Sequence, residues 1–215
     1  MRFNRKKIKK EYYFISILLI LFIILTIFVI SGKTSYIDEM TFNSLISLKN
    51  KPLTNSLYVI TSLGSTVGII ISLIVTLVIF LRYKALSDFK YVLGNVGFGV
   101  ILMKVLKTII RRVRPSWKWI VQGGFSYPSG HTISSLLFYG TLILLINKKV
   151  KGRYKKPLIY VFSLMILLIG ISRIYFGVHY LTDVVASILL GSIILIISNI
   201  IMNREFNNDK NKIKK

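Results

Sequence analysis

Two histidines and one aspartate are the residues of this 215-residue chain whose types and spacing could do chemistry. His179 and Asp183 are four positions apart, so they share one face wherever the chain there is helical. A carboxylate in that place can accept the proton of one imidazole nitrogen, fix the tautomer and leave the other nitrogen free to attack. Arg173, six residues before the histidine, adds a planar cation that suits phosphate. The stretch 172–183 therefore predicts nucleophilic chemistry on an anionic substrate.

A second polar stretch, residues 107–115, follows an apolar run and carries a cluster of cations. It begins with Lys107 and ends with Arg114 and Pro115, and the proline disfavours helical geometry at the residue before it. A phosphate group brings two or more negative charges, and an arginine can hold two phosphoryl oxygens at once. We expect Lys107 and Arg114 to bind phosphate together with Arg173.

A third stretch reads Pro-Ser-Gly-His over residues 128–131 and leads into another apolar run. Ser129 and Gly130 precede a predicted helix, whose free N–H groups and dipole favour an anion, and the glycine lets the backbone approach it. His131 is the second histidine of the chain. It could protonate a leaving oxygen and later deprotonate an attacking water.

The elements that must position these residues are helices in a membrane. Apolar residues make up 53% of the chain and the mean hydropathy is +0.65. Most of the long apolar runs reach the roughly 17–25 residues that a helix needs to cross a bilayer core. We place these runs at residues 12–30, 55–81, 90–110, 131–147, 157–177 and 181–202. They predict an all-α, polytopic membrane protein with six transmembrane helices, and one membrane-embedded domain over residues 1–215.

The net charge of +23 could suggest a nucleic-acid partner, but the positions of the charges indicate membrane topology. Alternate connections hold most of the basic residues: 6 in 1–11, 3 in 82–90, 6 in 148–156 and 5 in 203–215, which is 20 of the 30. Basic flanks of this kind mark the cytoplasmic side. We therefore expect a multi-pass protein of the cell membrane with a basic cytoplasmic N-terminus (1–11), a polar cytoplasmic tail (203–215), an outward-facing site and no nucleic-acid partner.

Other features of the outer connections suggest packing or anchoring. Residues 31–54 hold an apolar pattern between Met40 and Leu48 that predicts a short surface helix, which either packs on the protein or covers a lipid entrance. The pair Gly64 and Gly68 favours close helix packing within the second run. The cations expected to anchor the chain at the interface or contact lipid headgroups are Arg111, Arg112 and Lys118, beside the aromatic residues Trp117 and Trp119.

The inventory of metal ligands argues against a metal or another cofactor. Cysteine is absent, and Asp183 is the one carboxylate that we place at the edge of a membrane span. Two histidines and one carboxylate among many cations make a poor site for a divalent ion. The remaining acids lie away from the three stretches in sequence; they are Glu11, Asp38, Glu39, Asp88, Glu205 and Asp209. We predict metal-independent chemistry without a cofactor.

The three stretches together carry a family resemblance. They read Lys-x6-Arg-Pro at 107–115, Pro-Ser-Gly-His at 128–131 and Ser-Arg-x5-His-x3-Asp at 172–183. In this order they resemble the tripartite signature of the type 2 phosphatidic acid phosphatase superfamily, and the six-span layout extends the likeness over nearly the whole chain. The resemblance implies that His179 is a nucleophile forming a phosphohistidine and that His131 is the general acid and base.

The favoured function is a lipid phosphatase that removes a terminal phosphate from a lipid phosphate or diphosphate held in the bilayer. The composition looks bacterial, and the family's bacterial members imply undecaprenyl diphosphate as the first substrate to consider. Phosphatidylglycerophosphate and phosphatidic acid are the alternatives. A haloperoxidase-like activity fits the anion site but not the membrane spans. A non-catalytic lipid-binding or transport protein of the same fold is the alternative of another class. The sequence predicts no oligomeric state.

Overall fold

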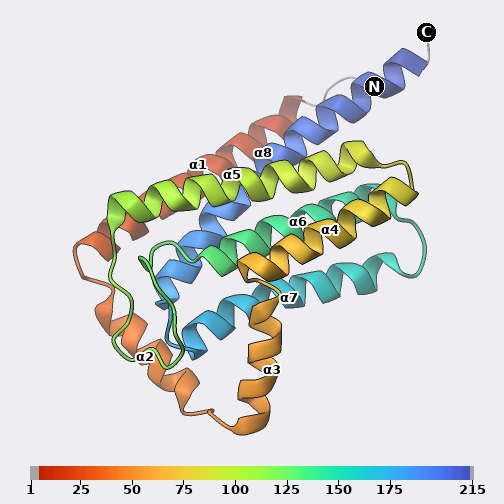
Figure 1. The fold of residues 1–215 in the computed structure, drawn as a ribbon. Coiled ribbons are helices and arrows are strands. Elements are labelled where there is room, and N and C mark those ends of the chain that lie inside the picture. Colours follow the sequence, from red (N-terminus) through yellow and green to blue (C-terminus); the bar gives the residue numbers. More distant parts are fainter. Residues whose placement is uncertain (1–4, 214–215) are drawn as a thin grey trace.

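The structure, a computed structural model, describes residues 5–213 (Figure 1). The regular secondary structure of these residues consists of α-helices. This confirms the predicted fold class. Residues 1–4 of the expected basic N-terminus and 214–215 of the expected tail lie outside the described residues. The helices are α1 (Arg5–Ile30), α2 (Ser35–Ile46), α3 (Lys51–Ser62), α4 (Thr66–Arg82), α5 (Leu86–Ile110), α6 (Gly130–Lys149), α7 (Lys155–Tyr175) and α8 (Leu181–Ile213).

Five of the described helices are long and apolar enough to cross a membrane by themselves: α1, α5, α6, α7 and α8. The helices α3 and α4 pass the same test only as a pair, and the chain bends by 58° between them. The described chain therefore has five candidate spans, or six if the bent pair counts as one. The multi-pass prediction is confirmed, whereas the prediction of one continuous helix over residues 55–81 is wrong.

The break between α3 and α4 has a local cause. Ser65 is extended and caps α4, because its hydroxyl oxygen accepts a hydrogen bond from the N–H of Gly68 at 3.0 Å. A Cβ atom on Gly68 would lie 2.0 Å from the carbonyl oxygen of Ser62, so only glycine lets the two helix ends approach so closely. Gly64 meets α6 and α7 instead, since its Cβ would lie 2.7 Å from Ser135 Oγ and 2.6 Å from Ile169.

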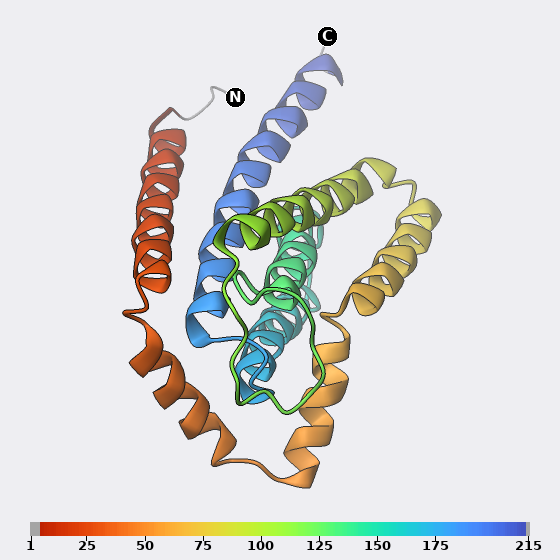
Figure 2. The ribbon, with the colours of Figure 1, turned by 60° about the vertical axis from the view of Figure 1, so that its left-hand side comes forward.

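Helix α6 is the centre of the bundle and packs against α5, α7 and α8, while α1 covers α8 (Figure 2). In the apolar stretch of α6, 56% of the residues are buried inside the protein, compared with 11% in α1 and α5. Glycines let α6 and α8 approach each other, because a Cβ on Gly140 would lie 2.5 Å from Leu195 and one on Gly191 would lie 2.6 Å from Leu136. Small residues at a helix interface are typical of membrane bundles.

The segment 31–54, the loop 111–129 and the turn between α7 and α8 lie at one end of the bundle, which we call the site end. The segment 31–54, expected to hold one surface helix, contains α2 and the start of α3. Residues 111–129 form a loop without helix that lies between α2 and α3 in Figure 2. Trp117 of this loop stacks on Phe42 of α2 with 5.3 Å between ring centroids, and Trp119 Nε1 donates to the carbonyl oxygen of Tyr175 at 2.9 Å. Both tryptophan rings therefore fix the loop to helices.

The opposite end of the bundle holds the first turn of α1 and the last turns of α8 (Figure 1). Helix α8 continues to Ile213, so the predicted change from a membrane span to a polar tail at residue 203 does not end the helix. The ion pair between Lys149 and Asp88 ties α6 to α5 at this end, with 2.6 Å between Nζ and Oδ2. The basic segments 82–90 and 148–156 also lie here.

The break between α3 and α4 leads to a prediction about stability. We expect Gly68→Ala to lower the free energy of unfolding by about 1–3 kcal/mol, the usual range for overpacking, because the new methyl group meets a backbone oxygen. Gly97→Ala in α5 is the matched control, since nothing lies within 4 Å of its added Cβ. Thermal unfolding in detergent, followed by tryptophan fluorescence, would measure both, and equal midpoints would contradict the explanation of the break.

Candidate active site

The turn between α7 and α8 carries His179 and is held by its backbone. Gly177 has a φ of +65°, the left-handed conformation that commonly follows the last residues of a helix. The N–H groups of Val178 and His179 then donate to the carbonyl oxygen of Arg173 at 3.2 and 3.3 Å. A Cβ on Gly177 would lie 3.0 Å from the carbonyl oxygen of Trp117, so the glycine also admits the 111–129 loop.

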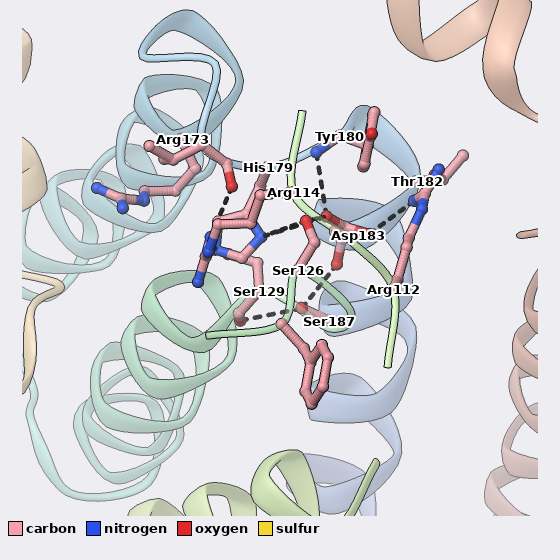
Figure 3. A network of polar contacts seen from close by, with 12 residues as sticks. Arg112, Arg114, Ser126, Ser129, Arg173, His179, Tyr180, Thr182, Asp183 and Ser187 are labelled. Atoms are coloured by element: carbon pink, nitrogen blue, oxygen red, sulfur yellow. Dashed lines mark hydrogen bonds and ion pairs between the residues drawn. The ribbon is translucent and has the colours of Figure 1, made fainter. Parts of the chain in front are cut away.

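His179 and Asp183 meet as expected, although not within one helix. Helix α8 begins at Leu181, two residues after the histidine, and Asp183 lies in its first turn. The carboxylate accepts from the N–H of Tyr180 at 3.1 Å, which caps the helix, and His179 Nδ1 lies 3.2 Å from Asp183 Oδ2 (Figure 3). Because the ionised carboxylate can only accept, Nδ1 carries the proton and Nε2 keeps its lone pair.

His179 is neutral in this environment. Its side chain is 2% exposed, and burial lowers its pKa to about 3; the nearby carboxylate of Asp183 opposes this shift only in part. The charges of Arg114 and Arg173 lower the pKa further. Above that pH the imidazole of the free protein is therefore unprotonated at Nε2, which is the form that a nucleophile requires.

Arg114 lies directly beside the free nitrogen of His179. Its Nη1 is 3.1 Å from Nε2 and also donates to the carbonyl oxygen of Val178 at 2.6 Å. Its Nε donates to the carbonyl oxygens of Gly123 and Gly124, both at 3.0 Å. Three backbone carbonyl oxygens thus orient the guanidinium. Any group attacked by Nε2 would lie next to its positive charge.

The other two predicted phosphate ligands approach from α5 and α7. Lys107 Nζ donates to the carbonyl oxygens of Phe125 and Ser126, the latter at 3.2 Å. Arg173 is 1% exposed; its Nη1 donates to Thr61 at 2.8 Å, its Nη2 donates to Gln122 at 3.0 Å, and its Nε has no hydrogen-bond partner. A buried N–H without a partner is costly, so this Nε is available to an incoming anion.

The Pro-Ser-Gly-His stretch forms the first turn of α6. Ser129 is buried and caps the helix, with its Oγ 2.9 Å from the hydroxyl of Thr132 and 3.5 Å from the N–H of that residue. Gly130 opens the helix, and Met103 is the side chain that its Cβ would meet, at 3.5 Å. His131 is partly exposed and lies within electrostatic range of His179 and the three predicted phosphate cations. All predicted site residues therefore gather at the site end.

Sequence reasoning missed two groups that hold Asp183. Ser126, in the loop, donates to Asp183 Oδ2, and Arg112 donates to Oδ1 at 2.7 Å (Figure 3). Arg112 also binds Asp38 of α2 at 2.8 Å. The expectation that Arg112 anchors the chain at the interface is therefore wrong, and Asp183 is not the one carboxylate at this edge. Asp38 lies four residues before Phe42 on the buried face of α2, and a charge on that face was the available signal.

The described residues contain no cluster of three or more His, Cys, Asp or Glu side chains that could hold a metal ion. Asp38, Asp183 and His179 are engaged with each other or with Arg112.

Comparison with known protein families identifies the family of this chain. Residues 89–207 match the model of the PAP2 superfamily, which covers more than half of the chain. The chain belongs to the PAP2 superfamily, as the three motifs indicated. It is a lipid phosphatase, a phosphomonoesterase that crosses the membrane several times. The predicted enzyme class is thereby confirmed, and the non-catalytic alternative is set aside.

Two similar proteins are named for activities on two different lipid substrates. The chain is 28% identical to phosphatidylglycerophosphatase B of Bacillus subtilis (strain 168) over 177 residues, which is 81% of this chain and 87% of that protein. It is 29% identical to undecaprenyl-diphosphatase of Sulfolobus acidocaldarius over 199 residues, 88% of this chain and 91% of that protein.

Solved structures agree with the fold. The crystal structure of a transmembrane PAP2 type phosphatidylglycerolphosphate phosphatase from Bacillus subtilis superposes with a TM-score of 0.83 at 26% identity, covering 89% of this chain and 97% of that one. LpxE of Aquifex aeolicus superposes with a TM-score of 0.59 at 24% identity, covering 78% and 95%, and shares the fold.

The hydrogen bond from Ser126 to Asp183 leads to a prediction about activity. We expect Ser126→Ala to lower kcat about tenfold, because a hydrogen bond to a buried charge contributes about 1.5–3 kcal/mol and the carboxylate would hold His179 less firmly. Ser116→Ala is the matched control, an exposed serine of the same loop. Phosphate release would be measured for both variants, and equal rates would rule out a role of Ser126 at the site.

Proposed function

We propose that this phosphatase removes the terminal phosphate of a membrane lipid phosphate or diphosphate through a phosphohistidine at His179. The observation that carries the proposal is the position of Asp183, 3.2 Å from Nδ1 of this histidine, which leaves Nε2 as the unprotonated nitrogen. Arg114 lies 3.1 Å from Nε2, so a phosphoryl group held by this arginine would lie against the nucleophile.

The proposed reaction has two steps. In the first, Nε2 of His179 attacks phosphorus, the bond from phosphorus to the lipid oxygen breaks, and His131 gives its proton to that oxygen. In the second, His131 takes a proton from water, the water oxygen attacks phosphorus, the bond from phosphorus to Nε2 of His179 breaks, and inorganic phosphate leaves. Asp183 stabilises the imidazolium character that develops on His179 in the first step.

The cations would bind the phosphoryl oxygens throughout. Lys107, Arg114 and Arg173 supply the positive charge, and the unpartnered Nε of Arg173 supplies a donor. The N-terminal end of α6, at Ser129 and Gly130, adds N–H groups and the helix dipole. Because these residues neutralise the phosphate, the proposed reaction needs no metal ion and no cofactor.

The proposed orientation places both termini in the cytoplasm and the site at the outer surface of a bacterial cytoplasmic membrane. The basic segments 82–90 and 148–156 support it, because they lie at the end of the bundle opposite the site. Basic connections favour the cytoplasmic side. The lipid would then stay in the bilayer while its phosphate is hydrolysed at the surface.

The first candidate substrate is phosphatidylglycerophosphate. Supporting it are the Bacillus subtilis protein named for that activity and the crystal structure of the same title, whose TM-score is 0.83. The second candidate is undecaprenyl diphosphate, which the sequence analysis favoured and which the relative from Sulfolobus acidocaldarius supports. Both present a terminal phosphate on a lipid, as does phosphatidic acid.

Phosphate release from purified protein in detergent would test the proposal. The substrates are phosphatidylglycerophosphate, undecaprenyl diphosphate and phosphatidic acid, each with excess EDTA. We expect release that persists in EDTA and falls at least about 1,000-fold in His179→Ala, because loss of a nucleophile removes the main reaction path. The substrate with the highest kcat/KM is the preferred one. Release that EDTA abolishes, or that survives in folded His179→Ala, would contradict the mechanism.

A further inference from the structure

Arg112 joins two buried carboxylates that are 145 positions apart in the sequence. Its Nη2 lies 2.8 Å from Asp38 Oδ2 and its Nη1 lies 2.7 Å from Asp183 Oδ1. Both carboxylate side chains are 0% exposed, and the arginine side chain is 14% exposed. Since each Nη group is engaged by a carboxylate, the charge of Arg112 is committed to the protein, unlike that of the predicted phosphate ligands.

Asp38 also holds the start of α8. Its Oδ1 accepts from the N–H of Thr182 at 3.0 Å, and both of its oxygens accept from the hydroxyl of that residue, at 3.0 and 2.9 Å. Thr182 is adjacent to Asp183, and it accepts a hydrogen bond from Arg112 Nη1 at 2.8 Å. Asp38 is therefore linked to Asp183 in two ways. One link is the guanidinium of Arg112, and the other is Thr182 in the first turn of α8.

Helix α2 is placed by this contact and by one aromatic stack. Asp38 and Phe42 are its buried residues, and Phe42 stacks on Trp117. Trp117 meets the ring of Tyr180 edge-on at 5.7 Å, and the guanidinium of Arg112 lies 3.8 Å from the centre of the same ring. Helix α2 thus directs its buried charge at Arg112 and at Thr182 in the first turn of α8.

We propose that Asp38 and Arg112 are positioning residues of the phosphatase, which act on His179 through the carboxylate of Asp183. The inference rests on the proposed role of His179 as the nucleophile. Arg112 fixes Oδ1 of Asp183, which leaves Oδ2 for the N–H of His179, and Asp38 fixes Arg112. The docking of α2 through Asp38 therefore helps to hold the nucleophile in the productive tautomer.

The two residues also set the charge around the histidine in opposite directions. Removing the negative charge of Asp38 disfavours a protonated His179 and lowers its pKa, whereas removing the positive charge of Arg112 raises it. The groups that face His179 are Asp183 from α8, Arg114 and Ser126 from the loop, Arg173 from α7 and His131 from α6. All of these remain in both variants, so the change in charge is confined to the positioning pair.

Steady-state phosphate release would test the inference with Asp38→Asn and Arg112→Gln. We expect kcat to fall about 10- to 100-fold in each, by analogy with the loss of hydrogen-bonded partners behind metal-binding histidines, with KM within about twofold. Arg112→Lys should recover part of the loss, because an ammonium can hold one carboxylate. The acid limb of kcat/KM should move to higher pH in Arg112→Gln and not in Asp38→Asn.

Two exposed neighbours provide matched controls. Glu39→Gln removes the same charge from α2, and Arg111→Gln removes the same charge from the start of the loop. Both should keep the kcat and the pH profile of the original chain. A loss in Arg112→Gln that appears in KM with kcat kept would instead make this arginine a headgroup contact and overturn the inference. Equal kcat in Asp38→Asn and Glu39→Gln would overturn it as well.

A second readout needs no substrate, so it separates failure of the inference from failure of the proposed function. The chain has two histidines, and His131→Ala assigns the nitrogen-15 signals of the other ring. We expect His179 to carry its proton on Nδ1 in the original chain and in both controls. Asp38→Asn and Arg112→Gln should add a measurable fraction of the Nε2–H tautomer. An unchanged tautomer with only a lower unfolding temperature would make the pair structural and overturn the inference.

Discussion

The structure depends on the burial of one negative charge, the carboxylate of Asp183. A carboxylate without partners would be very costly in so apolar a place, and this one is 0% exposed. Its two oxygens are satisfied by four donors, which come from Arg112, Ser126, His179 and the backbone of Tyr180. These partners lie in the loop after α5 and in the turn before α8. The charge therefore does two things at once, since it joins those segments and fixes the tautomer of the histidine.

The bundle makes this arrangement possible because the ends of several helices lie together at the site end. The close contacts of α6 with α8 bring the first turns of both helices together, so the N–H of Ser129 donates to the carbonyl oxygen of Asp183 at 3.3 Å. Ser187 of α8 donates back to the carbonyl oxygen of Ser129 at 3.1 Å. The lysine and arginine cations then approach from α5, its loop and α7. Like charges this close repel one another, and in the proposed reaction the phosphate of the substrate relieves this repulsion.

The sequence predicted which polar residues gather at the site end better than it predicted the structure around them. His179, Asp183 and the cations of the first and third motifs were found because their spacing is carried by short, local stretches. The pairing of Asp38 with Arg112 could not be found in this way, because it joins residues far apart in the chain and depends on how α2 docks. The break at Ser65 was hidden for a similar reason: the apolar run is continuous, and only the cap by that serine and the close approach at Gly68 interrupt the helix.

Phosphorylation of His179 during turnover would be detected by rapid quenching with a lipid labelled in its terminal phosphate. We expect label on the protein that is stable to alkali and lost in acid, as for a phosphoramidate, and that maps to the peptide containing His179. The label should persist longer in His131→Ala, because the attacking water then lacks its base, and should be absent in His179→Ala. Label on another residue, or turnover by His131→Ala at the full rate without any labelled protein, would contradict the account.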